Sequence, residues 1–260
     1  MISSRTHPPF AGRILAVWYR HYRVYTKNLI SNGLPPFLEP LIFLAGIGLG
    51  MGKYVTRMQN MPYIVFLATG LPITAAMFTA AFECSFGTFI RLEFDKVYDG
   101  MLAAPISAND LLMGEILWAG TKGLFFSVAV ISMEALFGIV PLPLSFLTGI
   151  VGFLTGLMFA TIALLVTSFV STINHFNFFF TGFLSPMFFF SGVVFPLENL
   201  PSVLRPVAEV FPLTHSVRMA RSLDLGLFSP ELGFDLVCIL GFIVITGYFA
   251  IRRLKRKLIQ

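Results

Sequence analysis

The sequence predicts an all-α membrane protein with six transmembrane helices, and three observations lead to this prediction. Of 260 residues, 56% are hydrophobic and only 12% are charged, with a mean hydropathy of +0.82, whereas soluble domains carry about 25% charged residues. Apolar runs near the length of a membrane-crossing helix recur along the chain. Charge is concentrated in short segments between them and at the two ends. We expect one membrane domain over residues 1–260.

Residues 10–30 are predicted to form an amphipathic helix at the inner membrane surface. Apolar residues recur at three- and four-residue steps, and cations repeat on another face. The rings would meet acyl chains and the cations would meet anionic headgroups. A cytoplasmic helix packed on protein is the alternative. The apolar positions are Phe10, Ile14, Trp18, Tyr22, Tyr25 and Leu29, and the cations are Arg13, Arg20 and Lys27.

Two prolines, Pro35 and Pro36, are expected to break this helix and to begin the first span, residues 36–52. Glycines recur along that span in overlapping GxxxG patterns, which let another helix backbone approach closely. A short outer loop then leads to the second span, residues 62–86. The glycines are Gly46, Gly48, Gly50 and Gly52.

The segment 89–107 is too charged to lie in hydrocarbon. Five of the nine residues 91–99 are charged, and one charge at the bilayer centre costs about 2.5–3.5 kcal/mol on insertion scales. We expect a cytoplasmic loop with a short helix that receives force from another protein. An ordinary solvated loop is the alternative. The charged residues are Arg91, Glu93, Asp95, Lys96 and Asp99.

Four further spans are predicted after this loop. The fifth span holds nine Phe, and the missing N–H of Pro186 at its middle predicts a kink. Five prolines interrupt residues 196–230, which are expected to form one or two short helices at the outer surface, with a return into the membrane as the alternative. The four spans are residues 111–140, 144–169, 176–195 and 232–251.

The positions of Lys and Arg predict that both termini are cytoplasmic. With the N-terminus inside, the inner segments hold twelve Lys and Arg and the outer segments hold five, and such an excess marks the cytoplasmic side. The net charge of +5 therefore indicates orientation in a membrane, and nucleic acid is not expected as a partner.

Five ionisable residues fall within the predicted spans, where such groups are functional candidates. Four lie toward the inner side, and we expect a salt-bridge network joining the inner ends of the first three spans. A proton relay is the alternative. Glu134 lies alone toward the outer side, and the sequence leaves its role open. The four inner residues are Glu39, Glu83, Glu115 and Lys122.

The chain is not expected to be an enzyme. The four histidines fall on unrelated segments, and Cys84 and Cys238 have no partner at metal-ligand spacing, so no metal site or disulfide is predicted. The sequence has no HExxH, GxSxG or Walker lysine motif. ATP hydrolysis by the Walker route would therefore need another chain.

The order of these parts resembles the ABC-2 family of bacterial export permeases. The closest branch resembles the nodulation-protein-J permeases, which export lipo-oligosaccharides. The resemblance covers nearly the whole chain. It is carried by EFDKVYDGMLAAPISANDLLMGEILWAGTK (93–122), FLSPMFFFSGVVFPLENLP (183–201) and FPLTHSVRMAR (211–221).

The resemblance implies a permease homodimer in the bacterial inner membrane, each copy paired with a separate ATPase subunit that holds ATP and Mg. This chain itself would need no cofactor. Its charged loop would contain the coupling helix that fits a groove on the ATPase. On a helix, Phe94, Val97, Met101 and Leu102 would share one apolar stripe, as in a helix-in-groove contact. The residues predicted for this contact are Glu93, Phe94, Asp95, Val97, Tyr98, Met101 and Leu102.

The glycine-lined first span and the Phe-rich fifth span are expected to border the translocation route. Aromatic faces can stack on sugar rings or contact acyl chains, and packing toward lipid is the alternative. The residues predicted for the route are Gly46, Gly50, Phe179, Phe183, Pro186 and Phe190.

The expected function is ATP-driven export of an amphiphilic or lipid-linked oligosaccharide. Export of drugs or antibiotics, and export of capsular or O-antigen polysaccharide, are alternatives within the same machinery. A proton-coupled secondary transporter using Glu39, Glu83 or Glu134 is the alternative of another class. It is disfavoured because no inverted repeat is visible. A membrane enzyme is a third alternative, which the missing catalytic site opposes.

Overall fold

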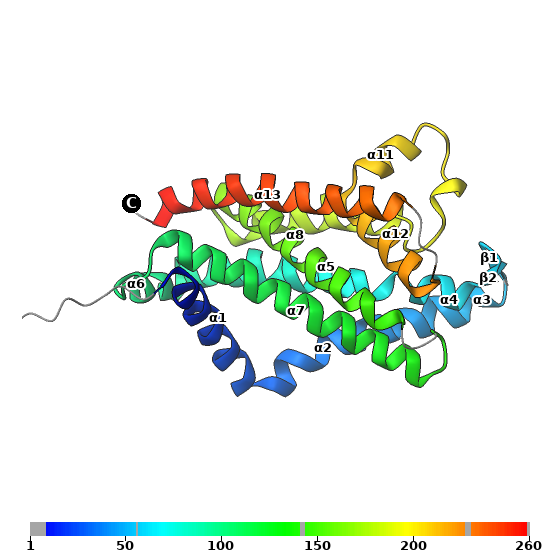
Figure 1. Ribbon diagram of the computed structural model, residues 1–260, viewed down its shortest axis with the longest axis horizontal. Coiled ribbons are helices and arrows are strands. Elements are labelled where there is room, and N and C mark those ends of the chain that lie inside the picture. Colours follow the sequence, from blue (N-terminus) through cyan, green and yellow to red (C-terminus); the bar gives the residue numbers. More distant parts are fainter. Residues whose placement is uncertain (1–8, 56, 141–143, 227–229, 259–260) are drawn as a thin grey trace, which may run out of the picture.

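Helices make up almost all of the structure. The computed structural model describes residues 9–55, 57–140, 144–226 and 230–258, and Figure 1 shows long helices running along its longest axis. In these ranges only one strand pair occurs, the antiparallel hairpin of β1 (Arg57–Met58) and β2 (Met61–Pro62). We call this end of the molecule the hairpin end. The opposite end, which carries α6 (Val97–Leu102), is called the α6 end.

Four helices of the described chain are long and apolar enough to cross a membrane. The predicted second span ends at residue 86 and the predicted sixth at 251, but their helices continue to Phe94 and Leu258. A helix can extend beyond the hydrocarbon because its backbone hydrogen bonds are internal, while its charged side chains reach water. The four helices are Tyr63–Phe94, Ala108–Leu136, Ser145–Phe169 and Glu231–Leu258.

Each long helix has a definite local construction. The first contains α4 (Tyr63–Ala68), α5 (Leu71–Phe82) and two π-helical turns, η2 (Glu83–Gly87) and η3 (Ile90–Phe94). The other three are α7 (Ala108–Leu136), α8 (Thr148–Phe169), which follows the 3-10 turn η4 (Leu144–Leu147), and α13 (Glu231–Leu258).

The predicted third span, 111–140, is displaced toward the α6 end. Helix α7 starts three residues earlier because Ser107 caps it, and its end is followed by Gly138 with φ of +66°. Glycine adopts this left-handed conformation without steric cost, which favours helix termination. The helix therefore occupies 108–136.

Glycines bring α7 and α8 into close contact at the centre of the bundle. A Cβ placed on Gly156 would lie 3.0 Å from the Cα of Gly120, and one placed on Gly152 would lie 2.5 Å from the Cβ of Ser127. Small residues let helix backbones approach in this way. Helix α5 packs against both α7 and α8, and α13 packs along α8.

The N-terminal helix ends earlier than the two prolines predicted. Helix α1 (Phe10–Lys27) stops at Asn28, whose φ of −127° and ψ of 50° are not helical. Helix α2 (Leu29–Phe43) then runs through Pro35 and Pro36 and continues as η1 (Leu44–Leu49) and α3 (Gly50–Gly52). The break at Asn28 lets α1 lie across α7 while α2 turns away along the bundle (Figure 1).

The Phe-rich segment is helical over 176–190, five residues shorter than the predicted fifth span. It consists of α9 (Phe176–Phe179), the π turn η6 (Phe180–Leu184) and α10 (Ser185–Phe190), after the 3-10 turn η5 (Ile173–His175). The wide turn lies immediately before Pro186, which cannot donate a backbone hydrogen bond. Ser191 and Gly192 then leave the helix, Gly192 with φ of +81°.

The segment 196–230 contains short helices as predicted, and its place at the outer membrane surface stays a prediction. It forms η7 (Leu197–Asn199), α11 (Arg205–Val210) and α12 (Pro212–Asp224). Residues 213–217 of α12 are all buried, and α12 contacts α5, α8 and α13. It packs inward because its apolar face, unlike that of a free surface helix, has three neighbouring helices to cover it.

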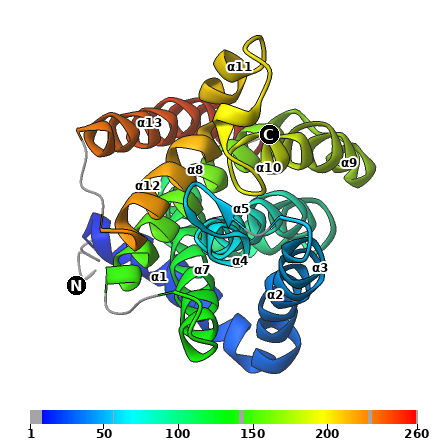
Figure 2. The same cartoon turned by 90° about the vertical axis from the view of Figure 1, so that its right-hand side faces the viewer.

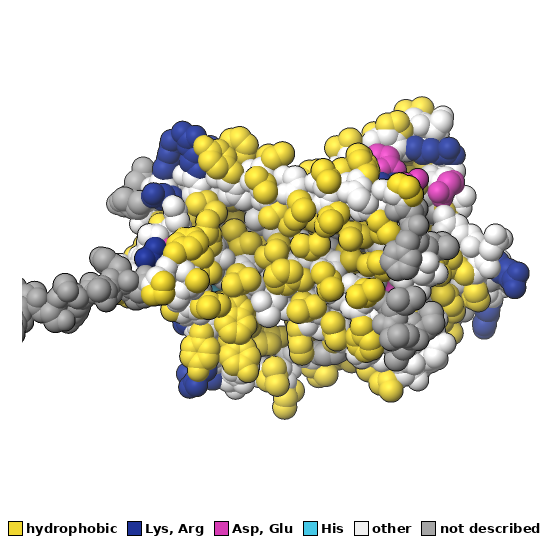
Figure 3. All heavy atoms as spheres, viewed as in Figure 1, with side chains coloured by type: hydrophobic (Ala, Val, Ile, Leu, Met, Phe, Trp, Pro, Cys, Tyr) yellow, Lys and Arg dark blue, Asp and Glu magenta, His cyan; other side chains and the backbone are white. Residues whose placement is uncertain are grey.

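The surface carries an apolar belt between two charged ends. In Figure 3 hydrophobic side chains cover the middle of the visible face, while Lys and Arg gather at the α6 end and charges of both signs lie at the hairpin end. The belt and the four long apolar helices show a protein built for a lipid environment.

Candidate functional site

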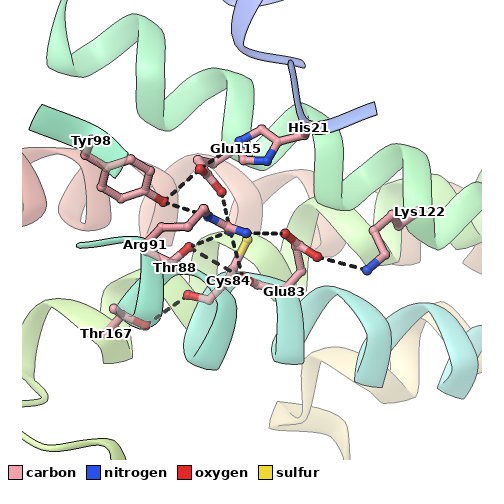
Figure 4. Close-up of polar contacts among 9 residues, drawn as sticks. All are labelled: His21, Glu83, Cys84, Thr88, Arg91, Tyr98, Glu115, Lys122 and Thr167. Carbon is pink, nitrogen blue, oxygen red and sulfur yellow. Dashed lines mark hydrogen bonds and ion pairs between the residues drawn. The ribbon is translucent and has the colours of Figure 1, made fainter. Parts of the chain in front are cut away.

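A buried set of ionisable side chains connects the helices at the α6 end, and we call it the charge cluster (Figure 4). It draws on α1, on the π turns of the first long helix, on α6 and on α7. Its members are His21, Glu83, Arg91, Tyr98, Glu115 and Lys122.

Arg91 lies at the centre of the charge cluster. Its Nη1 donates to Glu83 Oε1 at 2.8 Å, and its Nη2 donates to Glu115 Oε2 at 2.7 Å. The second oxygen of Glu83 accepts from Lys122 Nζ at 2.9 Å. One guanidinium therefore joins carboxylates of two helices, a geometry that suits arginine and not lysine.

Glu115 is fully buried, and three neighbouring side chains compensate its charge. Besides Arg91, the Tyr98 hydroxyl donates to Oε1 at 2.7 Å, and His21 Nε2 lies 2.8 Å from the same oxygen. A buried ion is tolerated only when its partners and hydrogen bonds are complete. The cluster thus joins α1, α6 and η3 to α7 at one point.

The two π turns place Glu83 and Arg91 for this role. A π turn widens the helix and displaces backbone carbonyls from their α-helical partners. At η2 the carbonyl of Cys84 accepts from Thr167 Oγ1 of α8 at 2.9 Å, and the carbonyl of Glu83 accepts from Arg91 Nη2 at 3.2 Å. The irregular backbone is therefore satisfied by the same neighbours that position the charges.

Helix α6 is separate from the helix before it. Lys96 has φ of 49°, a left-handed conformation that ends the run at Phe94 and starts a new direction at Val97. The predicted apolar stripe across Phe94, Val97, Met101 and Leu102 on one helix is therefore wrong, because Phe94 belongs to η3.

Tyr98 fastens α6 to the bundle. Its side chain is 1% exposed, and its hydroxyl accepts from Arg91 Nε at 3.4 Å and donates to Glu115. Burial, and then the Glu115 carboxylate, raise the pKa of Tyr98, so the phenol keeps its proton. This residue, predicted to touch a partner, faces inward and positions α6.

The other residues predicted for the coupling contact divide into two groups. Glu93, Phe94 and Asp95 are exposed, and Phe94 is 64% exposed. Val97, Met101 and Leu102 are half-buried, and the last two pack against the main core. The exposed surface at the α6 end is therefore formed mainly by residues that precede α6 in the chain.

A capping box holds the loop after α6 against α1. Ser107 Oγ accepts from the Asp110 N–H at 3.2 Å, and Asp110 Oδ2 accepts from the Ser107 N–H at 2.9 Å. Arg13 Nε donates to the same carboxylate at 2.8 Å. Together with Trp18 Nε1 donating to Thr121 Oγ1 at 3.0 Å, these contacts fix α1 on α7.

The charge cluster includes a possible metal-ligand set that its own cations disfavour. Ligand atoms of His21, Glu83 and Glu115 lie within 4.8 Å of one another. Both carboxylates already bind Arg91, and Glu83 also binds Lys122. A metal ion would have to approach these fixed positive charges, so the donor set fits ion pairing better.

The structure brings together three of the four residues predicted for the inner network, Glu83, Glu115 and Lys122. The side chain of Glu39 lies outside the described residues. The sequence analysis missed His21 and the joining roles of Arg91 and Tyr98. Arg91 could have been found by extending the second span past 86, because its charge then falls on the same helix as Glu83.

The residues predicted for the translocation route differ in how closely they are packed. A Cβ added to Gly46 or Gly50 would meet nothing within 4 Å. Phe179 is buried, Pro186 is half-buried, and Phe183 and Phe190 are exposed at the surface. Of the glycines in the first span, Gly48 is the one packed closely, with an added Cβ 3.2 Å from Ile64.

A cavity of about 490 Å³ opens between α2, α5 and α10. Four of its twelve described lining residues are Phe, and Lys122 of the charge cluster and Asn32 supply polar groups. None of the six residues predicted for the route is among its described lining residues. The lining includes Asn32, Phe43, Phe78, Phe82, Lys122 and Phe188.

The sequence profile of one protein family, described as "ABC-2 type transporter", matches residues 12–225. The chain belongs to this family. The matched region includes every residue of the charge cluster and the whole of α12. Membership in this family, together with the four long apolar helices, shows that the protein is a membrane transport permease.

Relatives of this ABC-2 permease cover nearly its whole length. It is 32% identical to "Nodulation protein J" of Sinorhizobium fredii (strain NBRC 101917 / NGR234), over 95% of this chain and 94% of that protein. It is also 32% identical to "Nodulation protein J" of Bradyrhizobium diazoefficiens, over 97% of each. "Inner membrane transport permease YadH" of Escherichia coli (strain K12) is 20% identical over 82% of each chain.

Proposed function

We propose that this permease exports an amphiphilic or lipid-linked oligosaccharide across the bacterial inner membrane, driven by ATP hydrolysis on a separate subunit. Family membership supports a transport subunit, and it implies an ATP-binding partner. The substrate class is the one that the resemblance to nodulation-protein-J permeases implies, and the similarity to proteins of that name over nearly the full chain supports the resemblance. ATP and Mg would bind the partner subunit.

The observation that carries the coupling proposal is the attachment of α6 to the charge cluster. A partner that displaces α6 acts on Tyr98, whose hydroxyl contacts both Glu115 and Arg91. Those two residues belong to α7 and to the first long helix. Since packed helices and ion-pair networks transmit displacement as discrete shifts, movement of α6 would be transmitted to the spans.

The partner surface would consist of the exposed end of η3 and the outer side of α6. Phe94 is the exposed apolar side chain there, with Glu93 and Asp95 beside it. An apolar anchor flanked by charges is the form of many peptide-in-groove contacts.

We propose six membrane passes with both termini in the cytoplasm. The four long helices would be joined by two shorter passes, α2–α3 and α9–α10. The basic residues of the C-terminal helix and α6 lie at the same end (Figure 1, Figure 3), which supports a cytoplasmic α6 end. Helix α1 would lie at the inner membrane surface, with Phe10, Tyr19 and Tyr22 exposed.

A homodimer is the proposed assembly. Large apolar side chains on the two shorter passes are exposed in the single chain, including Ile42 at 69%, Leu49 at 62% and Phe178 at 77%. A second copy or acyl chains would cover them.

The cavity between α2, α5 and α10 is the proposed entry site for the amphiphile. The Phe side chains in its walls suit an acyl chain, and Lys122 Nζ, 4.9 Å from the Tyr25 ring centroid, lies at its polar part. The predicted glycines and phenylalanines of the first and fifth passes would then border the route between two copies.

A transport assay tests the proposed function. The permease and the ATPase encoded beside it would be reconstituted in inverted vesicles, and uptake of a labelled lipo-oligosaccharide would be driven by ATP or by a proton gradient. We expect uptake with ATP only. Uptake with the proton gradient alone would favour the secondary transporter, and ATP-driven uptake of a hydrophobic drug without the oligosaccharide would reassign the substrate.

A further inference from the structure

A second, smaller cavity lies at the hairpin end, far from α6. It has a volume of about 190 Å³ and opens between α12, the loop after α10 and η7, elements that gather at this end in Figure 2. We call it the hairpin-end cavity. Its lining includes Gln59, Ser191, Glu198, Thr214, Arg218 and Arg221.

Arg221 is held rigidly in this cavity by neutral groups. Its Nε donates to Thr69 Oγ1 at 3.0 Å, and its Nη2 donates to the carbonyls of Phe66 at 3.2 Å and Gly192 at 3.0 Å. The guanidinium also lies 3.9 Å from the centroid of the Phe66 ring. Within the described part of the chain, no carboxylate oxygen lies within 4.0 Å of it and Nη1 makes no hydrogen bond.

The neighbouring Arg218, whose side chain is 27% exposed, is instead paired with carboxylates. Its Nη2 lies 2.6 Å from Asp235 Oδ1, and its Nη1 lies 2.8 Å from Glu209 Oε1. Arg218 is therefore neutralised, and these pairs raise its pKa. Burial lowers the pKa of Arg221 to about 10, with Asp224 and Glu198 opposing this shift, so Arg221 remains a cation at neutral pH.

Ser191 supplies a second unused donor in the same cavity. Its side chain is 1% exposed, and its Oγ makes no hydrogen bond within the described chain. A buried hydroxyl without a partner costs about 1–3 kcal/mol. Ser191 and Arg221 both line the hairpin-end cavity, and Ser191 precedes Gly192, whose carbonyl accepts from Arg221 Nη2.

We propose that the hairpin-end cavity binds one oxyanionic group, such as a phosphate or carboxylate, through Arg221 Nη1 and Ser191 Oγ. A half-buried arginine held by neutral groups, beside a buried hydroxyl donor without a partner, matches the needs of an oxyanion. Gln59 Nε2 donates to Glu198 Oε2 at 3.2 Å, so the hairpin and η7 meet at the exposed rim. The site does not depend on coupling to an ATPase or on the identity of the exported molecule.

The test uses purified full-length permease in phosphatidylcholine nanodiscs, with inorganic phosphate as the probe and calorimetry as the readout. We expect saturable binding that falls about tenfold or more in Arg221→Gln, since a charge-assisted hydrogen bond is lost. The matched control is Arg57→Gln, on β1 and outside the cavity lining, which should bind as the parent does.

Ser191→Ala keeps the proposal testable if Arg221→Gln fails to fold. The Ser191 hydroxyl has no partner to lose, so thermal stability without phosphate should be equal to that of the parent or higher, while phosphate affinity should fall about fivefold. No phosphate binding by the parent, or equal binding by the parent, Ser191→Ala and Arg221→Gln, would overturn the site.

Nanodiscs of phosphatidylglycerol separate two sources of the oxyanion. If a lipid headgroup is the natural occupant, the anionic lipid competes and apparent phosphate affinity falls in the parent protein. If the source is a soluble anion or the exported molecule, phosphate binds equally in both lipids. Either result supports the site, provided the Arg221 and Ser191 variants show the losses described.

Discussion

The two ends of the bundle differ in how completely their charged side chains are paired. At the α6 end, Glu83, Arg91 and Glu115 form a closed set in which each charge has a partner of opposite sign at 2.7–2.9 Å. At the hairpin end, Arg218 and Asp235 are paired in the same way. Beside them, however, Arg221 has no carboxylate partner among the described residues.

Further polar groups at the hairpin end are also left unpaired. Both carboxyl oxygens of Glu134 are buried and make no hydrogen bond within the described chain, and the same is true of the hydroxyls of Ser191 and Ser216. Asp224, by contrast, accepts from Thr148 Oγ1 at 2.7 Å.

This difference indicates that the two ends of the bundle have different roles. A closed ion-pair set resists rearrangement of its members and therefore suits transmission of force between helices. Unpaired buried groups are costly in the empty protein, so they favour a ligand or a proton that satisfies them. The unpaired groups at the hairpin end are therefore available to bind, although buried atoms without a hydrogen bond, His21 Nε2 and Asn109 Oδ1, also occur toward the α6 end.

The largest loss of stability should come from removing one charge from the charge cluster. In Glu115→Gln the side chain keeps its shape but leaves Arg91 and His21 without their carboxylate. Breaking a buried pair by removing one partner costs about 3–5 kcal/mol, so we expect a matching loss in the free energy of unfolding. Loss of monodisperse protein during a thermal ramp in detergent measures it.

The control for this change is Glu231→Gln at the exposed start of α13, which should alter stability by less than about 1 kcal/mol. If both variants lose the same stability, the charge cluster has no special structural role.

A smaller effect of opposite sign is expected at Asp224. Burial raises the pKa of Asp224 to about 6, although hydrogen bonds from Thr148 and Ser145 and the charge of Arg221 oppose the rise. Since the folded pKa exceeds the unfolded value of 3.8, folding binds a proton, and stability falls as pH rises from about 4 to 6.

Asp224→Asn should remove this pH dependence and stabilise the protein at pH 8 by about 1–3 kcal/mol. Thermal unfolding at a series of pH values compares the variant with the parent and with the exposed control Asp99→Asn. A variant that keeps the parent's slope between pH 4 and 6 would show that Asp224 is not the titrating group.

Tyr98→Phe removes the hydrogen bonds of the Tyr98 hydroxyl from the charge cluster and leaves its ion pairs in place. The ring stays buried, but Glu115 loses one donor, so we expect a loss of about 1–2 kcal/mol. ATP-driven transport should fall while the ATPase still co-purifies, because α6 is present but less firmly attached. Tyr54→Phe, at a side chain that is 88% exposed, is the control, and equal transport by both variants would argue against attachment through Tyr98.

Phe94→Asp should have the smallest effect on the free energy of unfolding, while it should disrupt the contact with the ATPase directly. The ring is 64% exposed, so thermal unfolding should stay within about 0.5 kcal/mol of the parent. Co-purification of the ATPase should be lost, since an apolar anchor becomes a charge. Phe94→Leu should retain the partner, and co-purification with the Asp variant at the parental level would move the contact elsewhere.

Local chemistry explains which parts of the fold were predictable. Long apolar runs depend on neighbouring residues, so the approximate positions of the long helices follow from them. The capping pair of Ser107 and Asp110, which starts α7 at Ala108, was not among the predictions. The ends of helices were less predictable. Asn28, and not Pro35, breaks the N-terminal helix, and Lys96 in a left-handed conformation separates η3 from α6.

The candidate site shows the same division. Glu83, Glu115 and Lys122 were identifiable because charge inside an apolar run is costly in lipid. The inward direction of Tyr98 was not identifiable, because it depends on where α7 places Glu115. His21 was likewise missed, since it is brought to the cluster only by the packing of α1 on α7.

The amino-acid order alone determined that this chain is a helical membrane protein with a charged segment excluded from lipid and with basic ends, because hydrocarbon penalises charge residue by residue. Only the tertiary structure decided which charges meet. Residues such as Arg91 and Glu115, or Ser191 and Arg221, are distant in the chain, and helix packing sets both the distances between them and which donors remain without a partner.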